Sequence, residues 1–473
     1  MVWRLSRPPT TSSCAEACDA PAAAALPTVA RGYYLEHPAV AALTADQADV
    51  IRQKAGIRTV QRGSVPVHCP NPVGSFLQAS FPQYMLDALA EAGFTAPTSI
   101  QRQGWPVAMM GHDLIGLAET GSGKTLTYLL PALVHVAAQP VLKEGDGPIA
   151  LAIAPTRELA VQIHEECVRF GVPCGVRTAC VYGGVPKVPQ IQELRKAPEV
   201  LVATPGRLCD LLAARKTKLS RCSYFVVDEA DRMLDLGFEP QLRTIVGAMR
   251  DDRQTLMFSA TWPQEVQTLA DAFLAPGVLM VEVGGALADA GKANVSIEQR
   301  LVFCAEESKL QRVVELLEQV MDGSRILIFA ASKRRCDELT RALRIDGWPA
   351  LAIHGDKSQE ERDWVLHQFK EGEQPLLVAT DVAQRGLDIK EVRHVVNYDC
   401  PSSSEAYVHR IGRTGRAGES GVAHTFVTPS DARVAPELAK VLRTSGQDVP
   451  AELERLVAEH ARDAQRHGRA ARR

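Results

Sequence analysis

The sequence predicts an α/β protein with two tandem domains, each built on a doubly wound parallel sheet. Two observations support this fold class. Short apolar runs alternate with helical stretches between residues 113 and 284, and the alternation starts again after residue 296. Such alternation is typical of a parallel sheet with helices on both faces. The stretch Gly284–Asn294 consists mainly of small and polar residues and separates the two series of strands and helices. It predicts a flexible linker, which we place at residues 284–296.

The composition is that of a globular protein. The chain has 473 residues, 46% of them hydrophobic and 23% charged, and this length is typical of two to four domains. No apolar run is long enough to cross a bilayer, so we expect no membrane-spanning helix. The net charge of −3 gives no general sign of nucleic-acid binding, so any such site must be a local patch. The eleven cysteines lack zinc-ligand spacing, which favours reduced thiols inside a cell.

Residues 1–30 are rich in Ala, Pro, Ser and Thr, and we expect them to form a disordered tail. Arg4 and Arg7 stand among hydroxyl residues, which is a feature of organellar transit peptides. Glu16 and Asp19 argue against such a peptide, because transit peptides contain few acidic residues. A plain flexible tail is therefore the favoured interpretation.

Two further segments flank the domains. Residues 31–75 form an N-terminal extension, in which Thr44–Gln47 has the pattern of a capping box that opens a helix ending near Gly56. Residues 446–473 combine a helical pattern with a basic end. That end indicates a solvated tail or, alternatively, a weak nucleic-acid contact or a nuclear signal.

The expected strands define domains over residues 76–283 and 297–445. Ligand sites of doubly wound sheets lie beyond the carboxyl ends of the strands, so we expect the functional residues there. In the first domain the expected strands are Asp113–Ala118, Ile149–Ala154, Arg177–Tyr182, Val200–Ala203, Tyr224–Val227 and Thr255–Phe258. In the second domain they are Gln299–Cys304, Arg325–Ala330, Ala350–Ile353, Leu376–Ala379, His394–Tyr398 and Val422–Val427.

The stretch Ala118–Thr125 has the pattern of a phosphate-binding loop, because it joins the first expected strand to the apolar-periodic helix Leu126–Val136. Its glycines let the backbone approach a phosphate, and the amides and dipole of the helix start favour an anion. Ala118 stands where the strict pattern has glycine, so a chance turn before a helix is the alternative. The expected phosphate contacts come from Thr120, Gly121, Ser122, Gly123, Lys124 and Thr125.

Four residues are expected to carry the chemistry of a nucleoside triphosphate. Lys124 supplies a positive charge for the β and γ phosphates, and Thr125 supplies a hydroxyl for Mg²⁺. Asp228 follows an apolar strand and can hold the same ion through water, because Mg²⁺ gives up water reluctantly. Glu229 is placed to orient and deprotonate the attacking water. An exposed acidic turn is the alternative for the two carboxylates, and the strand before them disfavours it.

The motif His409–Arg416 contains arginines separated by glycines. Phosphoryl transfer spreads charge over the γ-phosphate oxygens, and an arginine supplied there raises the rate about 10³–10⁵-fold. Arg413 and Arg416 belong to the second domain, so they would reach the phosphate only when the domains close. A solvated basic loop is the alternative, and it fits poorly with so many glycines.

With these motifs in this order, the chain resembles the DEAD-box RNA helicases of helicase superfamily two from Phe76 to Thr428. The resemblance implies two RecA-like domains that bind ATP-Mg²⁺ and RNA across the cleft between them. It extends, near both ends of the chain, to a branch that acts in nuclear RNA processing and ribosome assembly. The matched motifs are Gly93–Gln101, Ala118–Thr125, Pro155–Ala160, Gly183–Gly184, Thr204–Arg207, Asp228–Asp231, Ser259–Thr261, Arg385–Asp388 and His409–Arg416.

The resemblance implies further roles by position. Gln101 would read the adenine, Phe94 would stack near it, Phe76 would support the pocket and Asp388 would bind the ribose. As bare residues, the phenylalanines would more often be core and Gln101 a helix surface residue. Short polar turns at strand ends can likewise be simple caps. The residues that would couple nucleotide state to closure are Asp231, Ser259, Thr261 and His409. Those that would line the RNA track are Arg157, Gly184, Thr204, Arg207, Gly355 and Thr380.

The implied activity is an ATP-dependent RNA helicase that hydrolyses ATP to ADP and phosphate, and that separates short RNA duplexes or remodels RNA–protein complexes. Its RNA contacts would go to phosphates and sugars, so little base specificity is expected. The implied partners are RNA and RNA-processing complexes, in the nucleus or the cytoplasm. An ATP-gated RNA clamp, a DNA-directed helicase and a P-loop kinase are the alternatives. Glu119 and Gln384 depart from the residues usual in the family, so turnover could differ.

Overall fold

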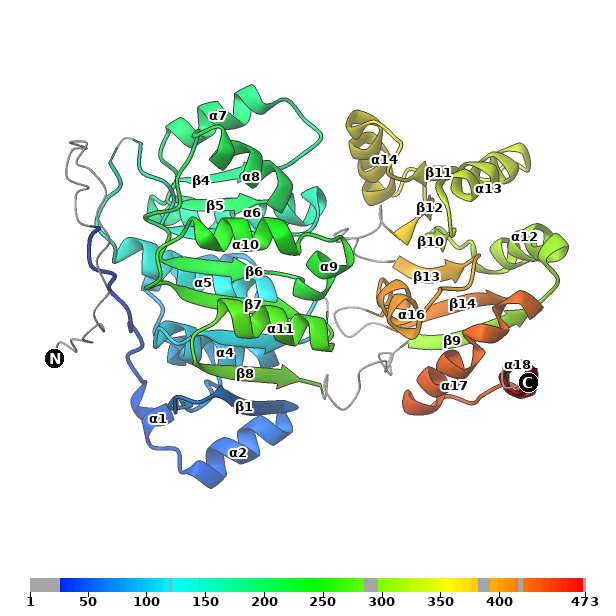
Figure 1. Cartoon of the computed structure of the whole chain (residues 1–473), viewed down its shortest axis with the longest axis horizontal. Helices are drawn as coiled ribbons and strands as arrows, with labels where there is room; N and C mark the ends of the chain where they lie inside the picture. The colour runs from blue at the N-terminus through cyan, green and yellow to red at the C-terminus, as the bar shows by residue number, and fades with distance from the viewer. Residues whose placement is uncertain are drawn as a thin grey trace.

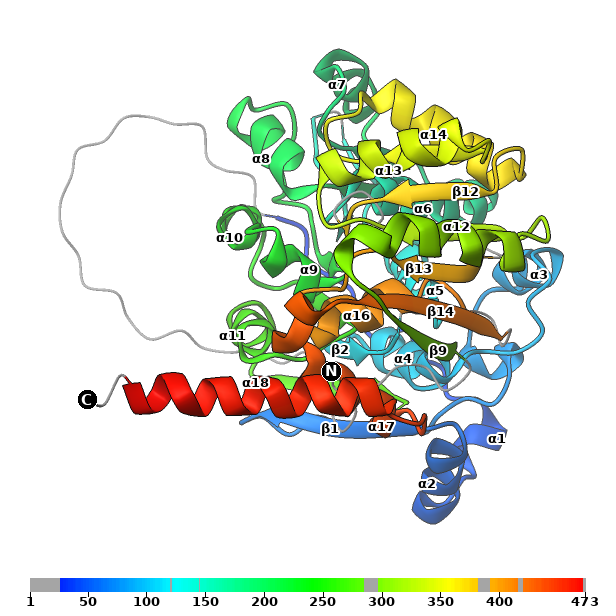
Figure 2. The same ribbon diagram turned by 90° about the vertical axis from the view of Figure 1, so that its right-hand side faces the viewer.

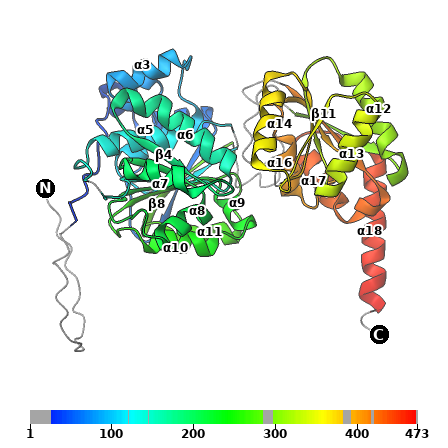
Figure 3. The same cartoon turned by 90° about the horizontal axis from the view of Figure 1, so that it is seen from above.

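The computed structural model describes residues 26–119, 121–143, 145–284, 297–381, 392–415 and 420–470. It has two α/β lobes, the first blue to green and the second yellow-green to red in Figure 1. Helices cover both faces of each sheet, as the view from above in Figure 3 shows. The predicted fold class is therefore confirmed. The expected linker lies outside the described residues except for Gly284. Within the described ranges, no helix combines the length and the apolar content needed to cross a membrane.

The strands of the first lobe are β1 (Ile57–Gly63), β2 (Leu114–Leu117), β3 (Ala150–Ile153), β4 (Thr178–Val181), β5 (Val200–Ala203), β6 (Tyr224–Val227), β7 (Gln254–Ser259) and β8 (Gly277–Val283). They form one sheet in the order β1-β8-β2-β7-β6-β3-β5-β4. Neighbours are parallel, except that β1 and β8 pair antiparallel. β2, β3, β5 and β6 are buried over their whole length, because helices cover both faces of the sheet.

The apolar pattern predicts six of these strands and misses β1 and β8. Only Ile57 is buried in β1, so this strand contains no apolar run that could reveal it. Its last residue, Gly63, has a φ of +86°, and a Cβ there would lie 1.8 Å from the carbonyl oxygen of Pro276. Glycine is therefore required where β1 passes the turn that leads into β8. β8 is apolar but directly precedes the expected linker, and no polar cluster marks its end.

The helices of the first lobe are α1 (Pro38–Ala41), α2 (Ala45–Lys54), α3 (Gln83–Glu91), α4 (Ser99–Met109), α5 (Lys124–Ala137), α6 (Arg157–Gly171), α7 (Lys187–Arg195), α8 (Pro205–Ala213), α9 (Ala230–Asp235), α10 (Glu239–Gly247) and α11 (Gln264–Phe273). The capping box predicted at the start of α2 is present. The Thr44 amide donates to Oε1 of Gln47 at 3.0 Å, and the Gln47 amide donates to Oγ1 of Thr44 at 3.3 Å. A second capping box, formed by Thr98 and Gln101, opens α4.

The last residues of the expected tail, 26–30, and the N-terminal extension both pack along the first lobe. Arg250 donates to the Pro27 carbonyl at 2.9 Å, and the amides of Tyr33 and Tyr34 donate to the Met109 carbonyl at 2.7 and 3.1 Å. Met109 ends the helix before β2 and Arg250 precedes β7, so these contacts lie at the amino-terminal ends of the strands. The later part of the extension reaches the opposite end of the sheet, where Ile57 pairs with Val283 and the Gly284 amide donates to the Gly56 carbonyl at 3.0 Å. Residues 1–25 of the expected tail lie outside the described residues.

The strands of the second lobe are β9 (Ile297–Phe303), β10 (Arg325–Phe329), β11 (Ala350–Ile353), β12 (Leu376–Ala379), β13 (Val392–Asn397) and β14 (Gly421–Val427). All pair in parallel, in the order β11-β12-β10-β13-β14-β9, and each was expected from an apolar run. The helices are α12 (Lys309–Val320), α13 (Lys333–Ile345), α14 (Gln359–Glu371), α16 (Ser404–Ile411), α17 (Ala435–Thr444) and α18 (Ala451–Ala470). Figure 2 shows α18 as a long helix at the C-terminal end of the lobe, where its buried Leu453 joins the core around α17.

Candidate functional site

The predicted phosphate-binding loop lies between the end of β2 and the start of α5. Gly121 and Gly123 have φ values of +83° and +90°, a region that favours glycine. A Cβ on Gly123 would also lie 2.7 Å from Nε2 of Gln101 and 2.9 Å from Oγ1 of Thr98, whereas one on Gly121 would meet nothing within 4 Å. The loop is therefore shaped both by backbone torsions and by close contact with α4. Thr120 lies outside the described residues.

Gly123→Ala is expected to weaken nucleotide binding about tenfold or more. The left-handed conformation costs an L-residue roughly 1–2 kcal/mol, and the added methyl group would displace the Gln101 amide. Gly121→Ala is the matched control, because it carries the same torsional strain without the overlap. Titration with a fluorescent nucleotide measures both variants. Equal losses in the two variants would mean that contact with Gln101 is unimportant for the loop.

The basic and hydroxyl groups of the loop bond to its own backbone. Nζ of the buried Lys124 donates to the Ala118 carbonyl at 2.8 Å, which holds the ammonium group across the loop. Oγ of Ser122 donates to the Glu119 carbonyl at 2.7 Å. An ammonium group has three donors, so Lys124 keeps two for a ligand while this bond stays intact. The loop is thus pre-shaped for an anion.

The predicted adenine residues gather around the start of α4. The side-chain amide of the buried Gln101 accepts from the Thr98 amide at 2.9 Å and donates to the Gly123 carbonyl at 3.1 Å. One N–H and one lone pair remain, which is the donor–acceptor pair that an adenine edge requires. Phe94 is 42% exposed, so its ring can take a stacking partner. Phe76 packs against Trp105 with ring centroids 5.9 Å apart, which places it as a support.

The two carboxylates after β6 are held in different ways. Asp228 is buried, and its oxygens accept from the Tyr128 hydroxyl and from the Glu229 amide, both at 2.9 Å. Burial raises the pKa of Asp228 to about 6, although the charge of Lys124 opposes the rise. Glu229 has a φ of +53°, a left-handed conformation that costs a non-glycine residue about 1–2 kcal/mol. Its carboxylate lies 3.3 Å from the guanidinium of Arg232.

Asp231 connects this turn to the end of β7. Its Oδ2 accepts from the backbone amide and the hydroxyl of Thr261, at 3.0 and 2.9 Å. The Asp231 amide donates to Oγ of Ser259 at 3.3 Å. Burial raises the pKa of Asp231, but the charges of His409 and Arg232 outweigh it and lower that pKa overall. Since His409 belongs to α16 of the second lobe, its charge acts on Asp231 across the two lobes.

The predicted site residues divide the first sheet into two halves. The described residues predicted for the phosphates and the metal ion follow β2 and β6. Ser259 and Thr261 lie at the end of β7, which is between β2 and β6 in the sheet, so these residues all lie over the neighbours β2-β7-β6. The residues predicted for RNA follow the next three neighbours, β3, β5 and β4. This order could not be read from the sequence, because strands that are adjacent in the sheet are not consecutive in the chain.

The RNA half of the first lobe carries two arginines with unused donors. Arg207 is buried and donates once, to the Val185 carbonyl at 2.8 Å, while its Nε and one terminal nitrogen have no partner among the described residues. The Arg157 guanidinium stacks on Tyr182, 4.6 Å from the ring centroid, and one of its terminal nitrogens is also unpartnered in the described structure. Thr204 precedes α8 without capping it through its side chain.

The second lobe repeats this division. Gly355 follows β11 and Thr380 follows β12, which are neighbours at one side of the sheet. Between β13 and β14, α16 carries His409, and Arg413 follows it with its side chain buried. Both are on the side of the sheet predicted for the nucleotide. Asp388 and Arg416 lie outside the described residues, as does Gln384.

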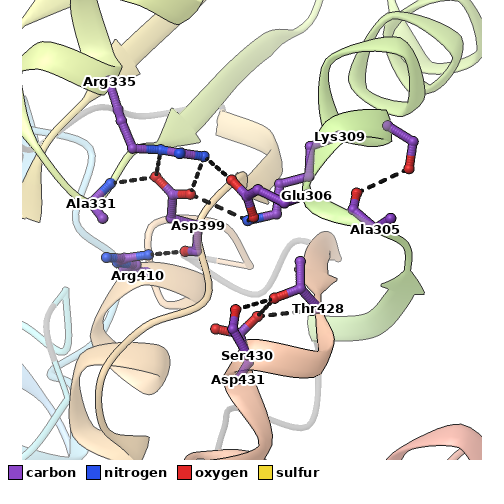
Figure 4. A network of polar contacts seen from close by, with 11 residues as sticks. Ala305, Glu306, Lys309, Ala331, Arg335, Asp399, Arg410, Thr428, Ser430 and Asp431 are labelled. Atoms are coloured by element: carbon purple, nitrogen blue, oxygen red, sulfur yellow. Dashed lines mark hydrogen bonds and ion pairs between the residues drawn. The ribbon is translucent and has the colours of Figure 1, made fainter.

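A polar network surrounds Asp399 and includes Arg410, the first arginine of the motif His409–Arg416. Figure 4 shows Asp399, just after β13, surrounded by Arg335, Lys309 and the Ala331 amide. The buried Arg410 donates to the Asp399 carbonyl at 2.7 Å and to both carboxylate oxygens of Asp381 at 2.6 Å. Arg410 therefore anchors α16 to the sheet, so it is a structural residue of the motif.

Ion pairs connect the two lobes at the start of α14. Arg157 of α6 lies 2.8 Å from Asp363 of α14, and the adjacent Glu158 pairs with Arg362. The Glu158 and Arg362 side chains are mostly buried, so their attraction is weakly screened by solvent. The same face of α14 lies near the Gly184 turn, where a Cβ would be 4.0 Å from Oε1 of Gln359. The start of α14 thus docks on the first lobe beside the predicted RNA residues.

Reversing the charges of the Glu158–Arg362 pair tests whether it stabilises the closed arrangement of the lobes. Glu158→Arg and Arg362→Glu should each reduce nucleic-acid-stimulated ATP turnover about tenfold, because like charges would then oppose closure of the lobes. The double variant should recover part of this loss, with a coupling energy of about 0.5–3 kcal/mol. Arg243→Glu, in an exposed pair within α10, is the control and should have little effect. Additive losses in the double variant would exclude direct pairing during turnover.

Comparison with known proteins identifies the family. A family model described as DEAD/DEAH box helicase matches residues 98–269, and one described as helicase conserved C-terminal domain matches residues 308–418. DEAD-box ATP-dependent RNA helicase 20 of Arabidopsis thaliana is 55% identical over 423 residues, which cover 89% of this chain and 83% of that protein. The chain belongs to the DEAD-box ATP-dependent RNA helicases. The sequence-based family assignment and the enzyme class, RNA helicase and ATPase, are thereby confirmed.

Further relatives agree with this helicase assignment. The ATP-dependent RNA helicase dbp2 of Neurospora crassa is 53% identical over 430 residues, which cover 90% of this chain and 75% of that protein. Among solved structures, S. cerevisiae Dbp5 bound to RNA and ADP BeF3 matches with a TM-score of 0.70 at 29% identity, covering 82% of this chain and 100% of that one. The fold of this DEAD-box chain therefore agrees with that of a helicase seen with RNA and nucleotide.

Sequence reasoning missed three residues of the site. Arg362 and Asp363 read as ordinary charged residues of a helix surface, and nothing in the pattern indicates that this surface meets the other lobe. Tyr128 gave a weak signal, because it is a phenol in a mainly apolar helix, four residues after Lys124 and so on the same face of that helix. That spacing could have placed its hydroxyl near the phosphate-binding loop.

Proposed function

We propose that this helicase binds ATP-Mg²⁺ over β2-β7-β6, binds RNA over β3-β5-β4 and β11-β12, and hydrolyses ATP when the second lobe completes the site. Lys124 and the loop amides bind the phosphates, Glu229 orients and deprotonates water, and Arg413 and Arg416 stabilise charge on the γ-phosphate. Gln101, Phe94 and Phe76 form the adenine pocket and Asp388 binds the ribose.

The metal assignment is supported by the chemistry of the donors. Thr125 and Asp228 offer a hydroxyl and a carboxylate, which are the hard oxygen ligands that Mg²⁺ prefers. The described residues contain no group of three or more His, Cys, Asp or Glu that could hold a metal. An ion at this place would therefore take its other ligands from phosphate and water, as Mg²⁺ commonly does. Bound there, it would neutralise charge on the phosphates.

The observation that carries the proposal is that Asp231 bonds to Ser259 and Thr261 and is also under the influence of the charge of His409. One carboxylate accepts two bonds from Thr261 of the first lobe and feels the charge of His409 from the second. The phosphate-binding site thus lies close to the junction of the two lobes. It also lies beside the strands that precede the residues predicted to bind RNA. ATP and RNA can favour the same closed state only if each binds it better than the open one.

The RNA half supports binding to the backbone of the nucleic acid. The unused donors of Arg157 and Arg207 suit phosphate oxygens, and Gly184, Thr204, Gly355 and Thr380 allow close approach of a strand. Contacts to phosphates and sugars carry no sequence information, so we expect little base specificity. We infer RNA-processing or ribonucleoprotein complexes as partners, in the nucleus or cytoplasm, from the family branch that the chain resembles.

ATPase rates with no nucleic acid, with single-stranded RNA and with DNA of the same sequence test this proposal. Strong stimulation by RNA alone is the expected result, with a duplex-separation assay as the second readout. Equal stimulation by DNA would overturn the substrate assignment. ATP-dependent retention of RNA without strand release would instead support an ATP-gated clamp.

A further inference from the structure

Helix α5 reaches the predicted metal site from its second turn. Tyr128 lies four residues after Lys124, and its side chain is 1% exposed. Its hydroxyl donates to Oδ2 of Asp228 at 2.9 Å. An ionised carboxylate can only accept, so the direction of this bond is fixed. It joins the phosphate-loop helix to the strand-end carboxylate across 100 residues of sequence.

Thr125 lies three residues before Tyr128 in α5, so the two side chains are neighbours on the surface of the helix. The bond from the Tyr128 hydroxyl to Asp228 therefore joins the part of α5 that carries Thr125 to the carboxylate that follows β6.

The position of the Tyr128 ring is itself fixed. The ring packs against Phe258 of β7, with centroids 5.3 Å apart, and Phe258 is confined because a Cβ on the facing Gly116 would lie 2.4 Å from its ring. The Tyr128 carbonyl accepts from the hydroxyl of Tyr224 at 2.9 Å. Tyr224 begins the strand that ends beside Asp228, so two phenols attach α5 to both ends of β6.

We propose that Tyr128 is a positioning residue for the magnesium site, whose hydroxyl holds the Asp228 carboxylate in the orientation that the ion requires. The inference rests on the proposed function, which places Mg²⁺ at Thr125 and Asp228. The Tyr128 hydroxyl takes one lone pair of Oδ2 and the Glu229 amide one of Oδ1, which leaves each oxygen another lone pair for the water around an ion. Outer groups of this kind typically change metal affinity 10–100-fold when removed.

The test is nucleotide affinity measured with Mg²⁺ and again with a chelator, in the full chain, by calorimetry with ADP. The ratio of the two affinities reports the ion and needs no catalysis. Tyr128→Phe keeps the ring and its packing but removes the hydroxyl. We expect it to lose about tenfold or more of the gain in affinity from Mg²⁺, and to keep its affinity in the chelator within about twofold.

Tyr224→Phe is the matched control. It removes a phenol bond of the same length from the same helix, at a buried site, without touching Asp228. A purely structural role predicts that both variants lower the unfolding temperature and that neither changes the response to Mg²⁺. If Tyr128→Phe retains the full Mg²⁺ gain, the positioning role is excluded.

Asp228→Asn separates this inference from the function on which it rests. If Asp228→Asn abolishes the Mg²⁺ gain and Tyr128→Phe reduces it, both assignments stand. If Asp228→Asn abolishes the gain and Tyr128→Phe leaves it intact, only the inference about Tyr128 fails. If Asp228→Asn leaves the gain intact, the proposed metal site is wrong, and the inference about Tyr128 falls with it.

Discussion

Glu229→Gln should stop ATP turnover while ATP and RNA remain bound. A glutamine has the same shape as glutamate but cannot take a proton from the attacking water, and loss of a general base typically costs about 10²–10⁴-fold in rate. The residue is held in a left-handed conformation between two carboxylates that are fixed by hydrogen bonds, so the substitution should not move the turn. Single-turnover hydrolysis with RNA present measures the effect.

Binding measurements on the Glu229→Gln variant distinguish a loss of catalysis from a loss of ATP or RNA binding. Equilibrium binding of a fluorescent nucleotide and of labelled RNA should match the parent protein within about twofold. Glu239→Gln, on the exposed surface of α10, is the control for a charge change in the same lobe and should leave turnover unchanged. Hydrolysis by Glu229→Gln at the parent rate would show that another group activates the water.

Arg413→Ala should spare ATP binding and reduce hydrolysis by about 10³–10⁵-fold, the range expected for an arginine that stabilises charge on the γ-phosphate. The residue belongs to the second lobe, whereas the phosphate-binding loop belongs to the first, so the loss should appear only in the closed complex. Rates measured with saturating ATP and RNA therefore report it. Arg413→Lys should recover only part of the rate, because a lysine lacks the planar fork of donors.

Arg410→Ala should reduce stability, whereas Arg413→Ala should reduce catalysis, so the two variants are compared. Arg410 is buried and donates to both oxygens of Asp381 and to the Asp399 carbonyl, so its removal takes a donor from each of these acceptors. Its loss should therefore lower the unfolding temperature of the second lobe. An Arg413 variant that unfolds as early as the Arg410 variant would indicate a structural role for both arginines.

The strands and the chemical motifs were predictable because they are local. An apolar run such as Tyr224–Val227 followed by two carboxylates needs no tertiary information to be recognised. The arrangement of those motifs was not predictable, because strands separated by a hundred residues become neighbours only in the sheet. The bond from Tyr128 to Asp228 and the contacts of Arg362 and Asp363 depend on that arrangement. β1 escaped prediction for a different reason, since a strand with one buried residue has no periodic signal.

β1 has a consequence for the edge of the first sheet. It covers the outer side of β8, whose Val278–Val281 run is buried and apolar. A chain that began at residue 76 would retain the whole phosphate-binding loop but would leave the backbone amides and carbonyls of β8 without partners. An apolar strand with a free edge pairs readily with the same strand of another molecule. The N-terminal extension thus acts as a covalently attached edge protector, and its arginines Arg58 and Arg62 make the new outer edge a poor template for self-association.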